Sequence, residues 1–142
     1  MRRATGAVLH TPLALCFLAE GYANVGQLKE GLNCLAEAAQ IIETTGERYY
    51  EAELFRLRGD LLNATGDPSA AELNYHQALA IAKRQGAKPH ELRAATSLAR
   101  LWRDQGKRAE SRDLLAPVYN WFTEGFDTPD LKETKALLDE LA

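Results

Sequence analysis

Apolar residues recur along the chain at intervals of three and four positions, which is the spacing of an amphipathic helix. No window of the sequence shows the sustained two-residue alternation that is typical of a half-buried strand. Glycine and proline punctuate the pattern, as at Gly66-Asp67-Pro68, where the residues suit a helix end, a cap and a helix start in turn. The pattern predicts seven helices, at about 11–24, 27–45, 48–64, 68–85, 89–105, 108–123 and 129–141.

The same pattern returns every 40 residues, in a register marked by Gly26, Gly66 and Gly106. Four further positions keep their size and polarity through three copies without an insertion: Ala19, Gly59 and Ala99; Gly31, Ala71 and Ser111; Leu35, Tyr75 and Leu115; Ala38, Ala78 and Val118. A small residue at a helix crossing lets two backbones approach closely. A helix pair of this kind cannot bury its apolar face alone, so we expect the copies to stack on one another.

The copies resemble the tetratricopeptide repeat. The resemblance rests on Leu18-Ala19-x-x-Tyr22 with Gly26 in the first copy, on Gly59, Gly66 and Tyr75 in the second, and on Leu98-Ala99-x-x-Trp102 with Gly106 in the third. The usual repeat has about 34 residues, and the longer period here lengthens the helices around 44–51 and 85–91. The resemblance implies an all-α fold, a right-handed superhelical α-solenoid of three antiparallel helix pairs followed by a C-terminal capping helix.

A closer resemblance covers residues 48–142, and it includes the run LLAPVYNWFTEGF at 114–126. These residues are similar to the extreme C-terminus of proteobacterial regulators that join an AAA-type ATPase and an adenylate/guanylate-cyclase-like module to a tetratricopeptide array. No ATPase or cyclase motif occurs in this chain, so neither activity is implied. The resemblance implies a non-catalytic protein–protein interaction module, a scaffold or sensor segment of a bacterial signalling protein.

The length of 142 residues fits one domain. We expect an N-terminal tail at 1–10 and a single domain at 11–142, with repeats at about 11–46, 47–86 and 87–126 and the capping helix at about 129–141. No run of about 18 apolar residues occurs, and the start Met1-Arg2-Arg3 is followed by no convincing cleavage site. Cys16 and Cys34 fit a reducing compartment. We therefore predict a cytoplasmic protein with no membrane contact.

The sequence offers no catalytic, cofactor-binding or metal-binding motif, so we expect neither an enzyme nor a cofactor. No glycine-rich phosphate loop with Lys-Ser/Thr is present. His10, His76 and His90 share no metal-ligand spacing. A cluster of aromatic residues, Tyr119, Trp121, Phe122 and Phe126, could form a binding box, but large rings dominate cores and we favour a place in the core.

In this family, the first helix of each pair lines the concave face of the solenoid. The positions that we expect to look away from the second helix, and so to be candidates for binding a partner, are Glu20, Arg56, Asp60, Asn63, Arg93, Thr96, Arg100 and Arg103. An ordinary solvated helix face is nearly as good an interpretation. The clamp that grips chaperone C-termini needs Lys and Asn at particular groove positions, and only Arg93 matches in charge, which disfavours a chaperone adaptor.

The net charge of −3 hides an uneven distribution. Residues 83–112 hold nine basic and three acidic side chains, a local charge of +6, whereas residues 123–142 hold six acidic side chains and two lysines, a local charge of −4. The basic segment could bind an acidic peptide or a phosphate-bearing ligand, with Arg93, Arg100 and Arg103 as the contacting stripe. It could equally be neutralised by the acidic last helix, which we favour slightly. Without a recognised module or interleaved aromatic residues, nucleic acid is not an expected partner.

The two ends of the stack differ. The last helix has one apolar and one polar side, the pattern of a cap. Nothing comparable precedes the first pair, which predicts an exposed apolar face and either a homodimer through it or a missing upstream repeat. Two other functions stay open, namely a structural spacer or oligomerisation domain and, with less support, an enzyme with an unrecognised site.

Overall fold

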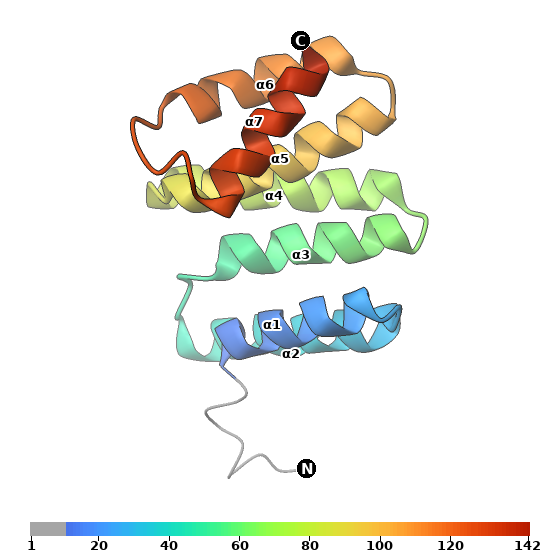
Figure 1. The fold of residues 1–142 in the computed structure, drawn as a ribbon. Coiled ribbons are helices and arrows are strands. Elements are labelled where there is room, and N and C mark those ends of the chain that lie inside the picture. Colours follow the sequence, from blue (N-terminus) through green and yellow to red (C-terminus); the bar gives the residue numbers. More distant parts are fainter. Residues whose placement is uncertain (1–10) are drawn as a thin grey trace.

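The computed structural model describes residues 11–142, so the tail predicted at 1–10 lies outside the described residues. Seven helices and no strand occupy the described part: α1 (Pro12–Asn24), α2 (Leu28–Thr45), α3 (Glu51–Ala64), α4 (Pro68–Gln85), α5 (Lys88–Asp104), α6 (Arg108–Asn120) and α7 (Pro129–Leu141). The prediction of an all-α fold is confirmed, and the helices follow the expected order (Figure 1).

Local sequence explains where the helices begin and end. The Thr11, Asp67 and Thr128 side chains accept hydrogen bonds from first-turn backbone amides of α1, α4 and α7, and each of these helices starts with a proline. Gly46 and Gly86 end α2 and α4 with φ of 75° and 66°, a left-handed conformation that other residues rarely adopt. The punctuation read from the sequence therefore sets the helix ends.

Two boundaries differ from the prediction. Helix α3 begins at Glu51 rather than near 48, and α6 ends at Asn120 rather than at 123. Pro117 lies within α6 and has no backbone N–H to donate to the preceding turn. The helix ends three residues after this proline, so the segment that carries Trp121 and Phe122 is not helical.

The helices form antiparallel pairs, α1 with α2, α3 with α4 and α5 with α6, which stack in chain order (Figure 1). The small residues meet where the helices of a pair cross. A Cβ on Gly59 would lie 2.6 Å from the Tyr75 ring, and the Ser111 hydroxyl donates to the Ala99 carbonyl at 2.7 Å. The register of small residues in the sequence is thus the register of helix crossings.

Each pair also packs on the next, because its first helix contacts both helices of the preceding pair or one of them. Core leucines such as Leu35, Leu61 and Leu98 are fully buried between the pairs. Helix α7 crosses over α5 and α6 at the C-terminal end of the stack (Figure 1). Its buried face consists of Leu131, Thr134, Leu137 and Leu141.

Candidate functional site

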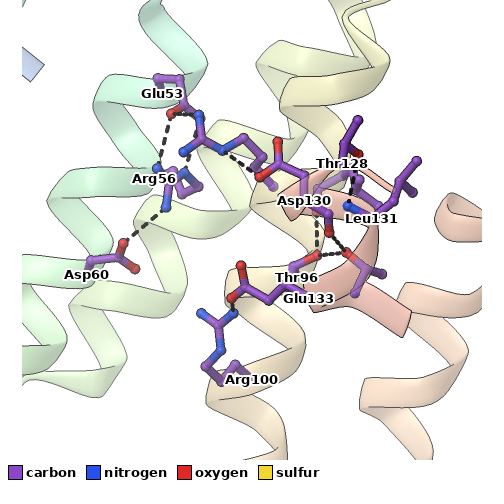
Figure 2. Close-up of polar contacts among 12 residues, drawn as sticks. Glu53, Arg56, Asp60, Thr96, Arg100, Thr128, Asp130, Leu131 and Glu133 are labelled. Atoms are coloured by element: carbon purple, nitrogen blue, oxygen red, sulfur yellow. Dashed lines mark hydrogen bonds and ion pairs between the residues drawn. The ribbon is translucent and has the colours of Figure 1, made fainter. Parts of the chain in front are cut away.

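The candidate residues cluster on the side of α3 and α5 that α7 approaches. On α3, Arg56 lies between two acids of its own helix: its Nε and Nη2 donate to the Glu53 carboxylate, both at 3.0 Å, and its Nη1 donates to Asp60 at 3.1 Å (Figure 2). These acids lie three residues before and four residues after the arginine, on one face of the helix. Arg56 is only 8% exposed, so this charge is fixed within the chain.

Arg93 connects α5 to the same cluster, because its Nη1 donates to Glu53 at 2.6 Å. Burial alone would raise the pKa of Glu53, but the hydrogen bond from Arg56 and the charges of Arg56 and Arg93 outweigh it and lower that pKa. Burial opposes the charge of Arg56 as well, and Glu53 and Asp60 together raise its pKa. The cluster is therefore ionised and mutually compensated across two successive repeats.

Asp60 is also tied to the second helix of its pair. The hydroxyl of the buried Tyr75 on α4 donates to the other oxygen of the Asp60 carboxylate. Burial and the neighbouring Asp60 charge raise the pKa of Tyr75, so the phenol stays protonated and keeps donating. Because Gly59 leaves room for the Tyr75 ring, a small residue at the helix crossing also positions this polar contact.

The arginine stripe, defined as Arg93, Arg100 and Arg103, is paired with α7. Arg93 lies 3.7 Å from Asp130, Arg100 pairs with Glu133, and Arg103 donates to Glu140 at 3.0 Å (Figure 2 shows the Arg100–Glu133 pair). All three pairs are partly open to solvent. The preferred interpretation of the charge distribution, neutralisation by the acidic last helix, is confirmed.

Thr96 is not available to a partner, contrary to the expectation that it looks into an open groove. It is 5% exposed, and its hydroxyl lies 2.9 Å from the hydroxyl of Thr134 on α7 (Figure 2). Beside this contact lies a polar cavity of about 60 Å³, which α3, α5 and α7 line with Arg56, Arg93 and Arg100 together with Asp130 and Glu133. Helix α7 therefore covers the α5 part of the predicted groove.

The expectation of an outward-facing position is also wrong for Arg56, which is buried for the reasons given above. Glu20 is half-buried on α1 and Asn63 is exposed near the end of α3. Neither side chain has a hydrogen bond or an ion pair with another residue of the described range 11–142. Asn63 borders an open hollow of about 180 Å³ with Asp60, Tyr75 and Arg100. The uncovered part of the candidate surface thus lies over α1 and α3.

The outer side of α1 is apolar and exposed, as predicted for the first pair. Phe17 is 63% and Val25 69% exposed, and with Leu18, Gly21 and Tyr22 they line an apolar hollow of about 630 Å³. The corresponding positions one repeat later are buried: Leu57, 40 residues after Phe17, is only 3% exposed. This face therefore has the character of a surface between repeats.

The aromatic cluster is not part of the core, so that prediction is wrong. Trp121 is 56% exposed, and Phe126 is also exposed. Together with Tyr49 and His90, Trp121 borders a hollow of about 680 Å³ between three loops, where the Lys88 ammonium lies 5.0 Å from the centre of the Trp121 ring. The sequence signal for this surface is Pro117, which ends the helix before the rings can follow its buried face.

The described residues show little that would support catalysis. No group of three or more His, Cys, Asp or Glu side chains within 11–142 is arranged to hold a metal ion. Burial, with the neighbouring Glu53 charge, raises the pKa of the Cys16 thiol to about 12, so this thiol is not poised as a nucleophile. Within the same range, no helix combines the length and the apolar character needed to cross a membrane.

Stacked helix pairs with small residues at each crossing and a capping helix at one end define a helical-repeat protein. A family model for the tetratricopeptide repeat matches residues 10–84, more than half of the chain. The chain therefore belongs to the tetratricopeptide-repeat family, whose members generally mediate protein–protein interaction and are typically non-catalytic. Among curated proteins, none matches the chain. The third pair and α7 lie beyond the matched residues and follow the same 40-residue register.

Proposed function

We propose that the chain is a non-catalytic interaction module that binds a peptide or protein partner on the face of its first helices. The observation that carries this proposal is the polar network joining α3, α4 and α5 through Glu53, Arg93 and Tyr75, because it holds charged groups rigidly at the rim of an open hollow. Fixed side chains bind with little loss of conformational entropy. The proposed contacts are Glu20, Asp60 and Asn63 on the uncovered part, and the arginine stripe for an acidic partner.

The test is capture of partners from the source organism by the folded chain and by a charge-reversed variant. Arg100→Glu with Arg103→Glu removes two arginines of the stripe while leaving the Glu53–Arg93 contact in place. Lys83→Glu with Arg84→Glu is the matched control, since both residues are exposed at the end of α4. Loss of the same captured protein from the first variant only supports the proposal. Equal capture by both variants contradicts a role for the stripe.

The context of the module is also part of the proposal. We infer a scaffold or sensor segment of a bacterial signalling or regulatory protein that acts in the cytoplasm. The support is the resemblance of residues 48–142 to the ends of such regulators, together with two cysteines that form no disulfide. Fluorescence microscopy of the tagged protein in its own cells tests this, and a fluorescent signal outside the cytoplasm contradicts it.

A structural spacer or oligomerisation domain is the second candidate, and the exposed apolar side of α1 favours it. This surface carries Phe17, Leu18 and Val25 and no charged side chain, so two copies could pair through it as a homodimer without like-charge repulsion. Light scattering on Phe17→Glu tests the homodimer, with Leu73→Glu as control because Leu73 is 69% exposed on α4. A clean monomer of the unmodified chain at high concentration contradicts it. For the remaining alternative, an enzyme with an unrecognised site, no arrangement described above offers support.

A further inference from the structure

Helix α7 contacts the third repeat in the way that a bound peptide helix would. One flank presents Asp130, Glu133 and Glu140 to the arginine stripe on α5. The neighbouring flank buries the face formed by Leu131, Thr134, Leu137 and Leu141. Apolar anchors next to a row of charges are how amphipathic helices are recognised in grooves.

The end of α7 is held by two further arginines, both on α6. Arg108 donates to the backbone carbonyl of Glu140, and Arg112 donates to the carbonyl of Leu141 at 3.0 Å. These carbonyls belong to the last turn of a helix, where no intrahelical donor remains and the helix dipole favours a positive charge. Five arginines from two helices therefore contact one acidic helix, along its flank and at its end.

The contacts of α7 suit reversible opening. Its ion pairs with the stripe are partly exposed, so each contributes little to stability. It packs on α5 and α6 alone, and residues 121–128 connect it to α6 without helical structure. A terminal element with few neighbours is among the first to open in a folded protein. Opening would uncover the stripe beside an apolar surface of α5 and α6.

We propose that α7 is an internal occupant of the partner surface, and that the partner is an acidic amphipathic helix that takes its place. The charge of +6 over residues 83–112 is complementary to such a helix, and the carboxylates of α7 show where the partner's acids would lie. This inference rests on the proposed function, because it names the partner of the arginine stripe. It adds that binding there is limited by the free energy of opening α7.

The test is a reversible lock between α5 and α7. The Thr96 and Thr134 hydroxyls lie 2.9 Å apart, so Thr96→Cys with Thr134→Cys places two thiols close enough for a disulfide that holds α7 down. Cys34→Ser in the same chain removes a half-buried thiol that could exchange with it. The probe is a fluorescent peptide with the sequence of residues 127–142, measured by anisotropy. The control peptide carries Asn, Gln and Gln in place of Asp130, Glu133 and Glu140.

We expect the reduced lock variant to bind the acidic peptide and the oxidised form to bind it at least 10-fold more weakly. The control peptide should also bind at least 10-fold more weakly, and reductant should not affect binding to the unmodified chain. Equal binding by the oxidised and reduced forms, or no binding by the reduced form and the unmodified chain, overturns the inference. A partner captured equally by both forms would do so as well, while leaving the proposed function intact.

Circular dichroism establishes whether the lock variant folds. If it does not, Leu137→Ala decides the question, because it removes an anchor of α7 without touching the arginines. Easier opening of α7 should then tighten peptide binding several-fold. Unchanged or weaker binding by Leu137→Ala overturns the inference.

Discussion

Replacing Glu53 with alanine should destabilise the fold far more than removing an exposed acid. The Glu53 carboxylate accepts two hydrogen bonds from Arg56, each of 3.0 Å, and one of 2.6 Å from Arg93. Without it, the charge of Arg56 stays buried, at 8% exposure, with Asp60 as its remaining partner among these acids. A buried charge that loses its partner is costly, because water cannot replace the lost contact.

The magnitude follows from this geometry. Removing one partner of a buried ion pair costs about 3–5 kcal/mol, and the low end applies because Asp60 still compensates part of the charge. We therefore expect a loss of about 3 kcal/mol in the free energy of unfolding, or about 10 °C in Tm for a chain of this size. Asp139→Ala also removes an ion pair, with Lys135 at 2.7 Å, but both of its side chains are exposed. That control should lose about 0.5 kcal/mol or less.

Urea unfolding followed by circular dichroism measures both variants. A third chain, Glu53→Leu with Arg56→Met, separates the burial of charge from loss of packing. Apolar replacement of both partners is often neutral or better, so this chain should be more stable than Glu53→Ala alone. A loss below about 1 kcal/mol for Glu53→Ala, within the range of exposed pairs, would refute the view that the cluster is a tightly compensated buried network.

Three further changes test other parts of the structure. Gly59→Ala should cost about 1–3 kcal/mol because its Cβ would lie 2.6 Å from the Tyr75 ring, whereas Gly21→Ala, with nothing within 4 Å, should stabilise α1 by up to about 1 kcal/mol; thermal melts distinguish them. The pKa of Glu53 is lowered in the folded state from its ordinary 4.5, so the unfolded chain binds more protons and stability should fall as the pH drops below 4.5 through the folded-state pKa; urea midpoints measured against pH show this fall, and Glu53→Gln should reduce it. Leu137→Ala should cost about 2–5 kcal/mol by leaving a cavity, more than Leu138→Ala at a half-buried position, as chemical denaturation would show.

The fold could be predicted because its determinants are local or strictly periodic. A helix crossing needs a small residue, so Gly59 and its equivalents repeat at 40 residues and reveal the stacking without any long-range information. Helix ends could be read from capping residues such as Thr11 and Gly86. The boundary of α6 was missed because the pattern of apolar residues continues past Pro117, although the helix does not.

The candidate site was predicted less well because its contacts join distant segments. Thr96 occupies an outward position on α5, and only the arrival of α7, with Thr134 38 residues later, buries it. Periodicity within one helix carries no information on what a later helix will cover. The neutralisation of the arginine stripe was nearer to prediction, because a basic and an acidic segment in adjacent elements attract each other whatever their detailed geometry.

The candidate surface therefore has two parts that respond to different perturbations. Over α1 and α3, Glu20 and Asn63 are reachable while α7 stays docked, so a partner bound there should be insensitive to a lock between α5 and α7. Over α5, Arg100 and Arg103 are already paired with α7, so a partner bound there must compete with an acidic helix of the same chain. Salt weakens the internal ion pairs and the partner's contacts together, because both are screened alike. Since the unfavourable and favourable charge terms partly cancel, the salt dependence of binding should be shallow on the arginine stripe.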